Sequence, residues 1–450
     1  MNRRRFLQGS ATGTALAASQ SSAAPSDRIR VGVIGSGGQG RNNLTDFQKN
    51  RDCMIVGVCD VFQPNLKRGI ELTDGRARAY TDYRRMLDDK EIDAVVVATP
   101  EHWHALMMVD ACNAGKDVYV EKPISLCVRE GRLMVDAARR NNRVVQVGIQ
   151  QRSGSHFQRA VKAVRDGRIG KVLYAQCWNH TWEPADSGVR AVEAPVPSDL
   201  DWDNWLGPAP KIPYSTARRR FGSYWSTGGG QMTNWAVHLV DIVHWATGED
   251  SPKSVAAMGG VMYLLNEDRE TPDTLQVMFQ YPGYQLYYST LRHNSMGHDG
   301  HPGNKPFGSY GIQLHGTDGT LFVDRAGYQI TPQTRGHADA GAMGSRDAYD
   351  DLTGVGMYFT TEGKGERGTT SIQHFPHVRN FLDCVKSRQR PIGDIEIGHR
   401  STVACHLANI AYRTGERIEW DGKSERITNS AKANALLTVK YREPWKLAGL

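Results

Sequence analysis

Cysteine is scarce in this sequence, and long apolar runs are missing. The seven cysteines are scattered, form no Cys-x-x-Cys pair, and fall in segments patterned like strands or buried helix faces. Such a set argues against a disulfide framework or a zinc site, and predicts buried thiols that behave as small hydrophobic side chains. No apolar run reaches the roughly 20 residues of a membrane-spanning helix, so no stable membrane insertion is expected.

Charge is only mildly biased. Lysine and arginine number 55 against 48 aspartates and glutamates, which gives a formal net charge of +7. Part of the excess comes from Arg3, Arg4 and Arg5, and no basic stripe with interleaved aromatics is present, so a nucleic-acid partner is not expected. With 450 residues, of which 39% are hydrophobic, the chain has the apolar material for two globular domains.

Residues 1–24 resemble a twin-arginine export signal. The arginine cluster leads into a modestly apolar stretch at 9–18, with small-residue sites at 15–17 and 22–24. A disordered basic tail is the alternative. The resemblance implies a periplasmic or otherwise exported protein, and because this route moves folded proteins, any cofactor is loaded before export.

Residues 25–150 alternate short apolar runs with amphipathic stretches, which predicts βαβ units and a parallel Rossmann-type sheet. Strands are expected at 30–34, 54–59, 78–80, 94–98, 117–120 and 144–147, and helices at 104–114 and 129–141.

Residues 151–450 are richer in Trp, Tyr, Gly and Pro, and predict an α+β domain with a mainly antiparallel open sheet. Strands are expected at 171–178, 254–263, 274–281 and 311–316, a loop at 326–368, and helices at 376–387 and 398–414. The final helices can pack back on the first domain.

A phosphate-binding turn follows the first expected strand. Gly35-Ser36-Gly37-Gly38-Gln39-Gly40 has the Gly-x-Gly-x-x-Gly spacing between a strand and a helix. Its glycines permit the tight turn, the approach of a pyrophosphate and close helix packing. Asp60 ends the next strand, where a carboxylate can accept hydrogen bonds from an adenosine ribose. It would repel a 2′-phosphate, and no arginine follows at 61 or 62, so NAD is favoured over NADP.

The fifth strand runs into Glu121-Lys122-Pro123 at the carboxyl edge of the sheet, where ligands bind in such folds. Near a cationic nicotinamide ring the pKa of Lys122 should fall, which would let it exchange a proton with a substrate hydroxyl. The alternative is a solvated lysine in a turn.

Together with Ala98-Thr99-Pro100, these motifs resemble the Gfo/Idh/MocA oxidoreductases over essentially the whole mature chain. The resemblance implies that Lys122 binds substrate and helps to transfer a proton, and that its bond to Pro123 is cis. It also implies a set of residues beside the cofactor, with a plain linker as the alternative for the last two: Thr99, Pro100, His102, His104, Glu121, Lys122, Gln151 and Arg152. A metal is not expected at His102 and His104, because i,i+2 side chains diverge on a helix.

Asn234 and His238 stand at i,i+4, which places them on one face of a helix. The family pattern is Asp-x-x-x-His, in which the histidine lies near the reacting carbon and serves as acid or base. Here an asparagine replaces the aspartate. An amide can hold a substrate hydroxyl or orient His238 but cannot take a proton, so proton transfer is left to Lys122 and His238. The change puts inositol or glucose specificity in doubt.

Tryptophans crowd between residues 178 and 235, and Trp182, Trp225 and Trp235 are candidates to stack on a sugar ring, although core packing explains each one singly. His298, Asp299 and His301 stand in a Gly-rich stretch. A solvated loop is expected there rather than a metal site.

These features predict an NAD-dependent oxidoreductase that moves a hydride to or from a carbinol carbon of a sugar or polyol. Free NAD is scarce outside the cytoplasm, so an exported enzyme must hold its cofactor tightly. A redox-neutral glycosidase is the alternative, although the Gly-Asn-x-Tyr-Pro-Thr-His segment associated with such relatives is replaced by the tract 230–238. A non-catalytic dinucleotide or sugar binder is a third possibility, against which Lys122 argues. The resemblance also implies a homo-oligomer, a dimer or tetramer formed through the open face of the second sheet.

Overall fold

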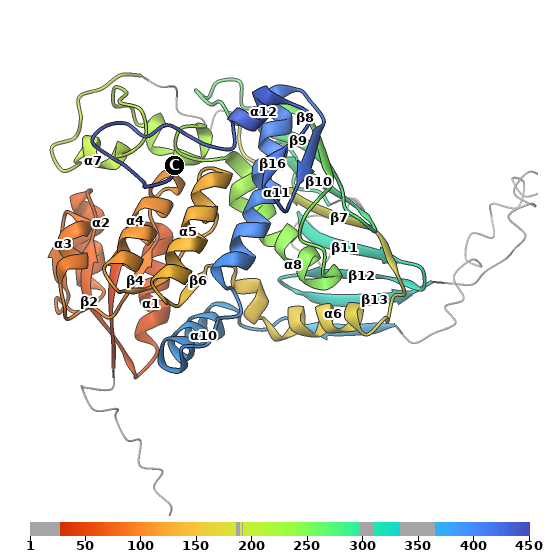
Figure 1. Ribbon diagram of the computed structural model, residues 1–450, viewed down its shortest axis with the longest axis horizontal. Coiled ribbons are helices and arrows are strands. Elements are labelled where there is room, and N and C mark those ends of the chain that lie inside the picture. Colours follow the sequence, from red (N-terminus) through yellow and green to blue (C-terminus); the bar gives the residue numbers. More distant parts are fainter. Residues whose placement is uncertain (1–27, 186–189, 191, 298–308, 334–364) are drawn as a thin grey trace, which may run out of the picture.

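Two β-sheets stand side by side in the computed structural model, each with its own helices (Figure 1). The structure describes residues 28–185, 190, 192–297, 309–333 and 365–450. The predicted signal at 1–24, the residues His298, Asp299 and His301, and the middle of the segment 326–368 lie outside this range.

The first sheet has six parallel strands in the order β3-β2-β1-β4-β5-β6, the arrangement of a dinucleotide-binding domain. Its strands are β1 (Ile29–Ile34), β2 (Cys53–Cys59), β3 (Arg78–Tyr80), β4 (Ala94–Val97), β5 (Asp117–Val120) and β6 (Val145–Val147). Its helices are α1 (Gly38–Gln48), α2 (Gln63–Glu71), α3 (Tyr83–Asp88), α4 (Glu101–Asn113) and α5 (Val128–Arg140). The apolar β4 is fully buried because helices cover both faces of the sheet.

The second sheet has ten strands, in the order β14-β13-β12-β11-β7-β10-β9-β8-β15-β16. They are β7 (Val172–His180), β8 (Ser254–Gly260), β9 (Thr274–Gln280), β10 (Gln285–Leu291), β11 (Tyr310–Gly316), β12 (Gly319–Asp324), β13 (Gly327–Pro332), β14 (Glu366–Thr369), β15 (Ile418–Asp421) and β16 (Arg426–Ile427). Only β7 and β10 pair in parallel within the described sheet. The predicted fold class, a Rossmann-type domain followed by a mainly antiparallel sheet, is confirmed.

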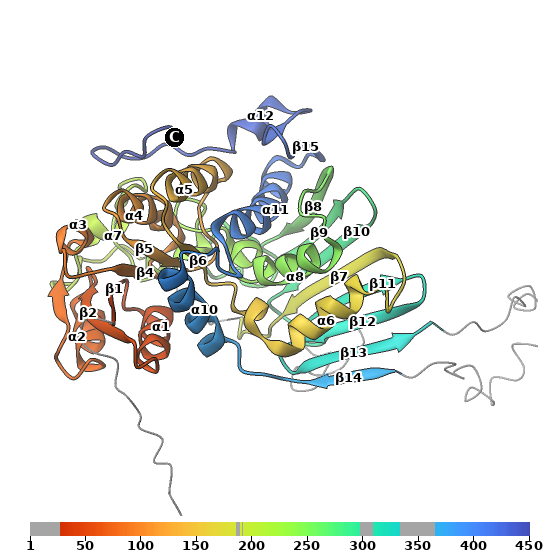
Figure 2. The ribbon, with the colours of Figure 1, turned by 60° about the horizontal axis from the view of Figure 1, so that its bottom comes forward.

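Helices lie on one face of the second sheet and connect it to the first. Figure 2 shows α6 (Ser155–Arg165), α8 (Val237–Thr247) and α11 (Ile395–Thr414) on that face. The late helix α10 (His374–Ser387) packs back on the first sheet, where Phe381 lies 5.9 Å from the rings of both Phe47 and Tyr119.

The second sheet holds the main corrections to the expected elements. The segment 326–368 is not a loop at its ends, since β13 and β14 occupy them, and β10 and β12 had no counterpart in the prediction. The strand expected at 254–263 stops at Gly260, because the amides of Met262, Tyr263 and Leu264 donate to the Asp273 carboxylate instead of continuing the ladder.

All seven cysteines are buried free thiols, as their positions predicted. Among the described helices, none has the length and apolar character needed to cross a bilayer.

Candidate functional site

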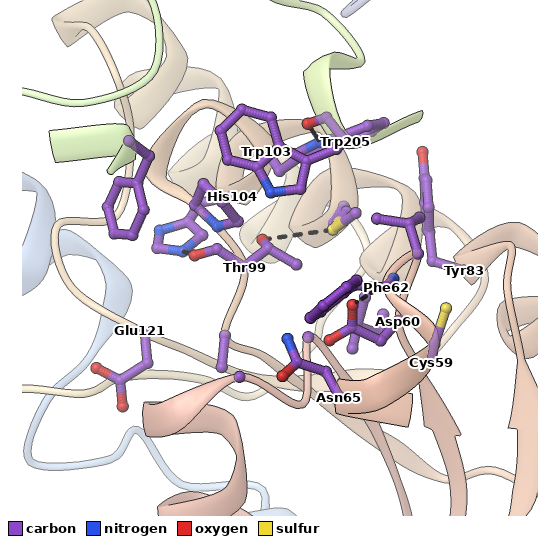
Figure 3. Close-up of a pocket in the computed structure, with 18 of the residues that line it drawn as sticks. Cys59, Asp60, Phe62, Asn65, Tyr83, Thr99, Trp103, His104, Glu121 and Trp205 are labelled. Carbon is purple, nitrogen blue, oxygen red and sulfur yellow. Dashed lines mark hydrogen bonds between the residues drawn. The ribbon is translucent and has the colours of Figure 1, made fainter. Parts of the chain in front are cut away.

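A cleft of about 450 Å³ opens at the carboxyl ends of β1, β2, β4 and β5. Figure 3 shows Asp60, Phe62 and Asn65 on one side, Glu121 on the other, and Trp103 with Trp205 along the top. Several predicted residues line it, namely Gly35, Gly37, Gly38, Gln39, Asp60, Thr99, Pro100, His104, Glu121, Lys122 and Asn234.

The glycine turn has the geometry that its spacing predicts. Gly35 has a φ of +85°, and a Cβ there would lie 2.6 Å from the Ala98 carbonyl oxygen, so a side chain is excluded twice over. A Cβ on Gly40 would lie 1.8 Å from the Gly35 oxygen, which explains the close packing of helix on strand. Gly37 and Gly38 line the cleft at the start of α1, so helix N-terminal amides are available to an anion.

Asp60 is held at the end of β2 by the turn itself. Its Oδ2 accepts a hydrogen bond of 2.8 Å from the Ser36 amide, and its Oδ1 accepts one of 2.9 Å from the Phe62 amide. Burial raises the pKa of Asp60, while these hydrogen bonds oppose the rise. Ser36 is fully buried and therefore acts on the cleft through Asp60.

Lys122 reaches from the β5 edge to the second half of the chain. Its Nζ donates to the Asn234 carbonyl oxygen at 2.6 Å and to Asn234 Oδ1 at 2.9 Å. Burial lowers the pKa of Lys122, and the carboxylates of Glu121 and Glu101 partly oppose that change. The Lys122–Pro123 bond is cis, as expected from the resemblance.

Asn234 lies in a π-helical turn, Met232–Ala236, that precedes α8. The turn is wider than an α-helical turn, and regular α-helix resumes at Val237. The shared face of Asn234 and His238 stays a prediction. Asn234 lines the cleft, whereas His238 does not belong to its lining. The buried His238 has its ring centroid 6.2 Å from that of Trp235, and burial holds its pKa well below the ordinary value, with Lys122 as the next cause.

Glu101 is a site residue that the sequence reasoning missed. It lies buried in the first turn of α4, where it accepts hydrogen bonds from the Gly229 amide at 3.0 Å and from the Thr233 hydroxyl at 3.0 Å. Burial raises the pKa of Glu101 to about 7. Thr233 directly precedes Asn234 in the chain, so its hydrogen bond to Glu101 helps to position Asn234, which in turn binds Lys122. Its place after Thr99-Pro100 at a helix start was the available signal.

Glu121 is a buried acceptor at the same end of the cleft. It accepts hydrogen bonds from Asn43 Nδ2 at 2.9 Å, Gln150 Nε2 at 3.3 Å and Gln39 Nε2 at 3.4 Å. The predicted residues Gln39 and Glu121 are therefore in contact, and Glu121 connects helix α1 to the turn that carries Lys122.

The two histidines of α4 are engaged with main-chain carbonyls. His104 lies 2.7 Å from the Pro123 oxygen and 2.8 Å from the Thr99 oxygen, so it ties the lysine turn to the β4 edge. His102 lies 3.1 Å from the Trp205 oxygen, outside the cleft lining. Burial lowers the pKa of His102 to about 4, so this ring is neutral at physiological pH.

The remaining predicted residues lie apart from the cleft lining. Gln151 Nε2 donates to the Tyr310 hydroxyl, and Arg152 forms a buried ion pair with Asp241 at 2.7 Å. Trp235 packs 5.3 Å from Tyr310, and Trp225 lies 6.3 Å from Tyr412. Trp182 is 60% exposed.

A segment that follows β7 in the chain lies over the cleft, and sequence reasoning did not foresee it. This cover, residues 199–221, includes α7 (Trp202–Leu206) and lies above the first sheet (Figure 1). The Gln63 amide donates to the Asp199 oxygen at 2.9 Å, and the Asp201 amide donates to the Val61 oxygen at 3.0 Å. The Arg219 guanidinium lies 4.2 Å from the Phe62 ring, and both line the cleft.

The C-terminal tail braces the cover. Arg442 pairs with Asp203 at 2.9 Å, and the Trp445 ring lies 4.8 Å from Trp103, which donates to the Trp205 oxygen at 2.9 Å. Trp445 itself lines the cleft. The cover and the C-terminal tail, which are far apart in sequence, therefore both line the cleft.

Three family models match consecutive parts of the chain. They are the NAD-binding Rossmann fold of the Gfo/Idh/MocA oxidoreductases at 29–149, a Gfo/Idh/MocA C-terminal domain at 157–322, and a C-terminal alpha/beta domain of the same oxidoreductases at 369–447. The chain belongs to the Gfo/Idh/MocA family. The resemblance read from the glycine, aspartate and lysine motifs is confirmed.

Three of the relatives and solved structures that match are distantly similar to this chain. "Glycosyl hydrolase family 109 protein 1" of Shewanella sp. strain MR-4 is 29% identical over 207 residues, which cover 39% of this chain and 45% of that protein. "Inositol 2-dehydrogenase" of Salmonella paratyphi B is 24% identical over 182 residues, covering 40% and 54%. The matches thus span about half of these relatives. The solved WlbA dehydrogenase of Bordetella pertussis, in complex with NADH and UDP-GlcNAcA, shares the fold with a TM-score of 0.62 and 20% identity, covering 88% of this chain and 99% of that one.

The cleft fits the dinucleotide NAD, as predicted. Gly38 has open space where a side chain would stand, and the Asp60 carboxylate lines the same cleft. Open glycine amides at a helix start suit a pyrophosphate, and a strand-end carboxylate suits a ribose diol. Of the predicted residues, Gly37, Gly38 and Asp60 would hold these groups.

Proposed function

We propose that this protein catalyses NAD-dependent oxidation or reduction at a carbinol carbon of a sugar or polyol. The observation that carries the proposal is the placement of the Lys122 ammonium, which lines the dinucleotide cleft and is bound to Asn234. A lysine whose pKa is lowered by burial is suited to exchange a proton with a substrate hydroxyl.

The chain's own residues would divide the work. Bound NAD supplies the hydride acceptor or donor. In its neutral form, Lys122 accepts the proton of the substrate hydroxyl, and Asn234 Oδ1 directs the lysine amine. His238, whose ring lies 6.2 Å from that of Trp235 and whose pKa is lowered by burial, is proposed as the second acid or base.

We further propose that the cofactor stays bound through turnover and that the protein is exported by the twin-arginine route. The cover and the C-terminal tail support retention, because Trp205, Arg219 and Trp445 all line the cleft. A cofactor enclosed in this way would be loaded before export and regenerated in place.

A second candidate is a redox-neutral glycosidase, favoured by the relatives named as glycosyl hydrolase family 109 proteins. In that chemistry, oxidation at one sugar carbon acidifies its neighbour and allows elimination of the aglycone. The same lysine would serve both reactions.

Assays on free sugars, polyols and aryl glycosides separate the candidates. The oxidoreductase is expected to change the absorbance of the bound nicotinamide when a free sugar or polyol is added. Release of an aglycone with no net change in the cofactor would favour the glycosidase, and neither signal with any substrate would leave only a binding role.

We also propose a homo-oligomer through the open face of the second sheet. Leu173 of β7, Met258 of β8 and Met278 of β9 are exposed on strands of this sheet. A dimer or tetramer is expected in native mass spectrometry, and its loss is expected when Met258 and Met278 are changed to Lys.

A further inference from the structure

Arg325 is an arginine without an acidic partner in the described part of the chain. It lies between β12 and β13, and its guanidinium carbon stands 5.0 Å from the Trp235 ring and 5.9 Å from the Tyr310 ring. Its Nε is buried and has no hydrogen-bond partner among the described residues. The adjacent Asp324 carboxylate instead accepts hydrogen bonds from the Ala326 and Gly327 amides, at 2.7 Å and 3.1 Å.

This guanidinium lies next to the proposed reaction centre. Trp235, one of the rings that hold it, follows Asn234, the partner of Lys122. The same ring lies 6.2 Å from that of His238. Arg325 also contributes to the lowered pKa values of Lys122 and His238, after burial as the main cause.

Other polar atoms around Trp235 and Tyr310 also lack partners within the described residues. His238 Nδ1 and Gln151 Oε1 are both buried and unbonded. Gln151 uses its amide nitrogen on the Tyr310 hydroxyl, so only its oxygen is left over. A buried polar group without a partner destabilises the fold, because it loses its hydrogen bonds to water and gains none in return. Several such atoms around one pair of aromatic rings indicate a place where a polar ligand binds.

We infer that the substrate carries a carboxylate and that Arg325 binds it, so that the protein acts on a sugar acid such as a uronate or aldonate. A guanidinium offers a planar fork that matches a carboxylate with two parallel hydrogen bonds. The two aromatic rings hold that fork in place before binding. Sugar hydroxyls alone would leave the positive charge of Arg325 without a counter-charge. The assignment of a reaction at a carbinol carbon rests on the proposed function, but the recognition of the carboxylate by Arg325 does not.

The test compares each acid with a neutral molecule of the same shape. Full-length protein with NAD bound is titrated calorimetrically with D-glucuronate and D-glucuronamide, then with D-galacturonate and D-gluconate and their amides. At least one acid is expected to bind about tenfold or more tightly than its amide, as a charge-assisted hydrogen bond provides. Arg325→Met should remove this preference while leaving NAD content and the unfolding temperature unchanged. The matched control is Arg367→Met, an exposed arginine on the neighbouring β14, which should keep the preference.

Equal binding of acids and amides across the panel would overturn the inference. So would an Arg325→Met protein that unfolds at lower temperature yet still prefers the acids, because Arg325 would then have only a structural role. The two proposals can fail separately. Acids that bind through Arg325 without any redox change would contradict the proposed reaction but not the carboxylate site. Turnover of neutral sugars without a preference for acids would contradict only the carboxylate site.

Discussion

Lys122 binds Asn234 through both oxygens of that residue, with Nζ 2.6 Å from the carbonyl oxygen and 2.9 Å from Oδ1. Both acceptors are neutral, so neither adds a full negative charge to oppose the effect of burial. The pKa of Lys122 therefore stays lowered in spite of Glu121 and Glu101. A lysine in this setting loses its proton more readily than a solvated one.

Replacing the lysine should stop the chemistry without releasing the cofactor. Lys122→Met is expected to lower kcat/KM by about 10²–10⁴-fold, the range for loss of a general acid–base group, while NAD content stays at the wild-type level. Lys67→Met, on the exposed side of α2, is the control and should leave both unchanged. Wild-type turnover by the Lys122→Met protein would remove the lysine from the mechanism.

Substrate oxidation should become faster as the pH rises toward the lowered pKa of Lys122, because only the neutral amine can accept a proton. Asn234→Asp places a negative charge beside the ammonium, which favours the charged form and raises that pKa. The ascending limb of kcat/KM against pH should therefore move to higher pH. Asn113→Asp, at the exposed far end of α4, should not move it. An unmoved limb in Asn234→Asp would show that another group titrates.

Glu101 should make stability depend on pH. Its pKa is raised to about 7 in the folded protein from an ordinary value of 4.5, so the folded state holds a proton that the unfolded state releases. Stability from this group is complete below about pH 4.5 and is lost as the pH rises to about 7. The unfolding temperature of wild type relative to Glu101→Gln should fall across that window and then level off. The same comparison with exposed Glu71→Gln should be flat.

Arg219 should slow the release of NAD. Its guanidinium lies over Phe62 inside the cleft and joins the cover to the first sheet. Arg219→Ala is expected to raise the NAD dissociation rate roughly two- to thirtyfold, the value of a cation–π contact. Arg218→Ala, whose guanidinium lies 4.1 Å from Tyr224 instead, is the control. Equal dissociation rates in wild type and Arg219→Ala would show that the cover does not retain the cofactor.

The dinucleotide cleft could be predicted from sequence because its parts are local. The tight turn at Gly35, the carboxylate at Asp60 and the lysine at the β5 edge each follow a buried strand, and strands of a parallel sheet present their carboxyl ends at one edge. No long-range contact has to be known to place them.

The rest of the site depends on contacts between distant residues. Glu101 meets Thr233 across 132 positions, and the cover reaches the first sheet through a bridge between Phe62 and Leu200. The π-helical turn at Met232–Ala236 was also not predicted, since the i,i+4 spacing of Asn234 and His238 suggests a regular α-helix.

Native mass spectrometry of the full-length protein, after extensive buffer exchange and without added cofactor, tests the central claim most directly. The account predicts that each chain carries one NAD, and that Arg219→Ala loses more of it than wild type does. A chain that emerges without a dinucleotide and takes up none on incubation with NAD would contradict the account.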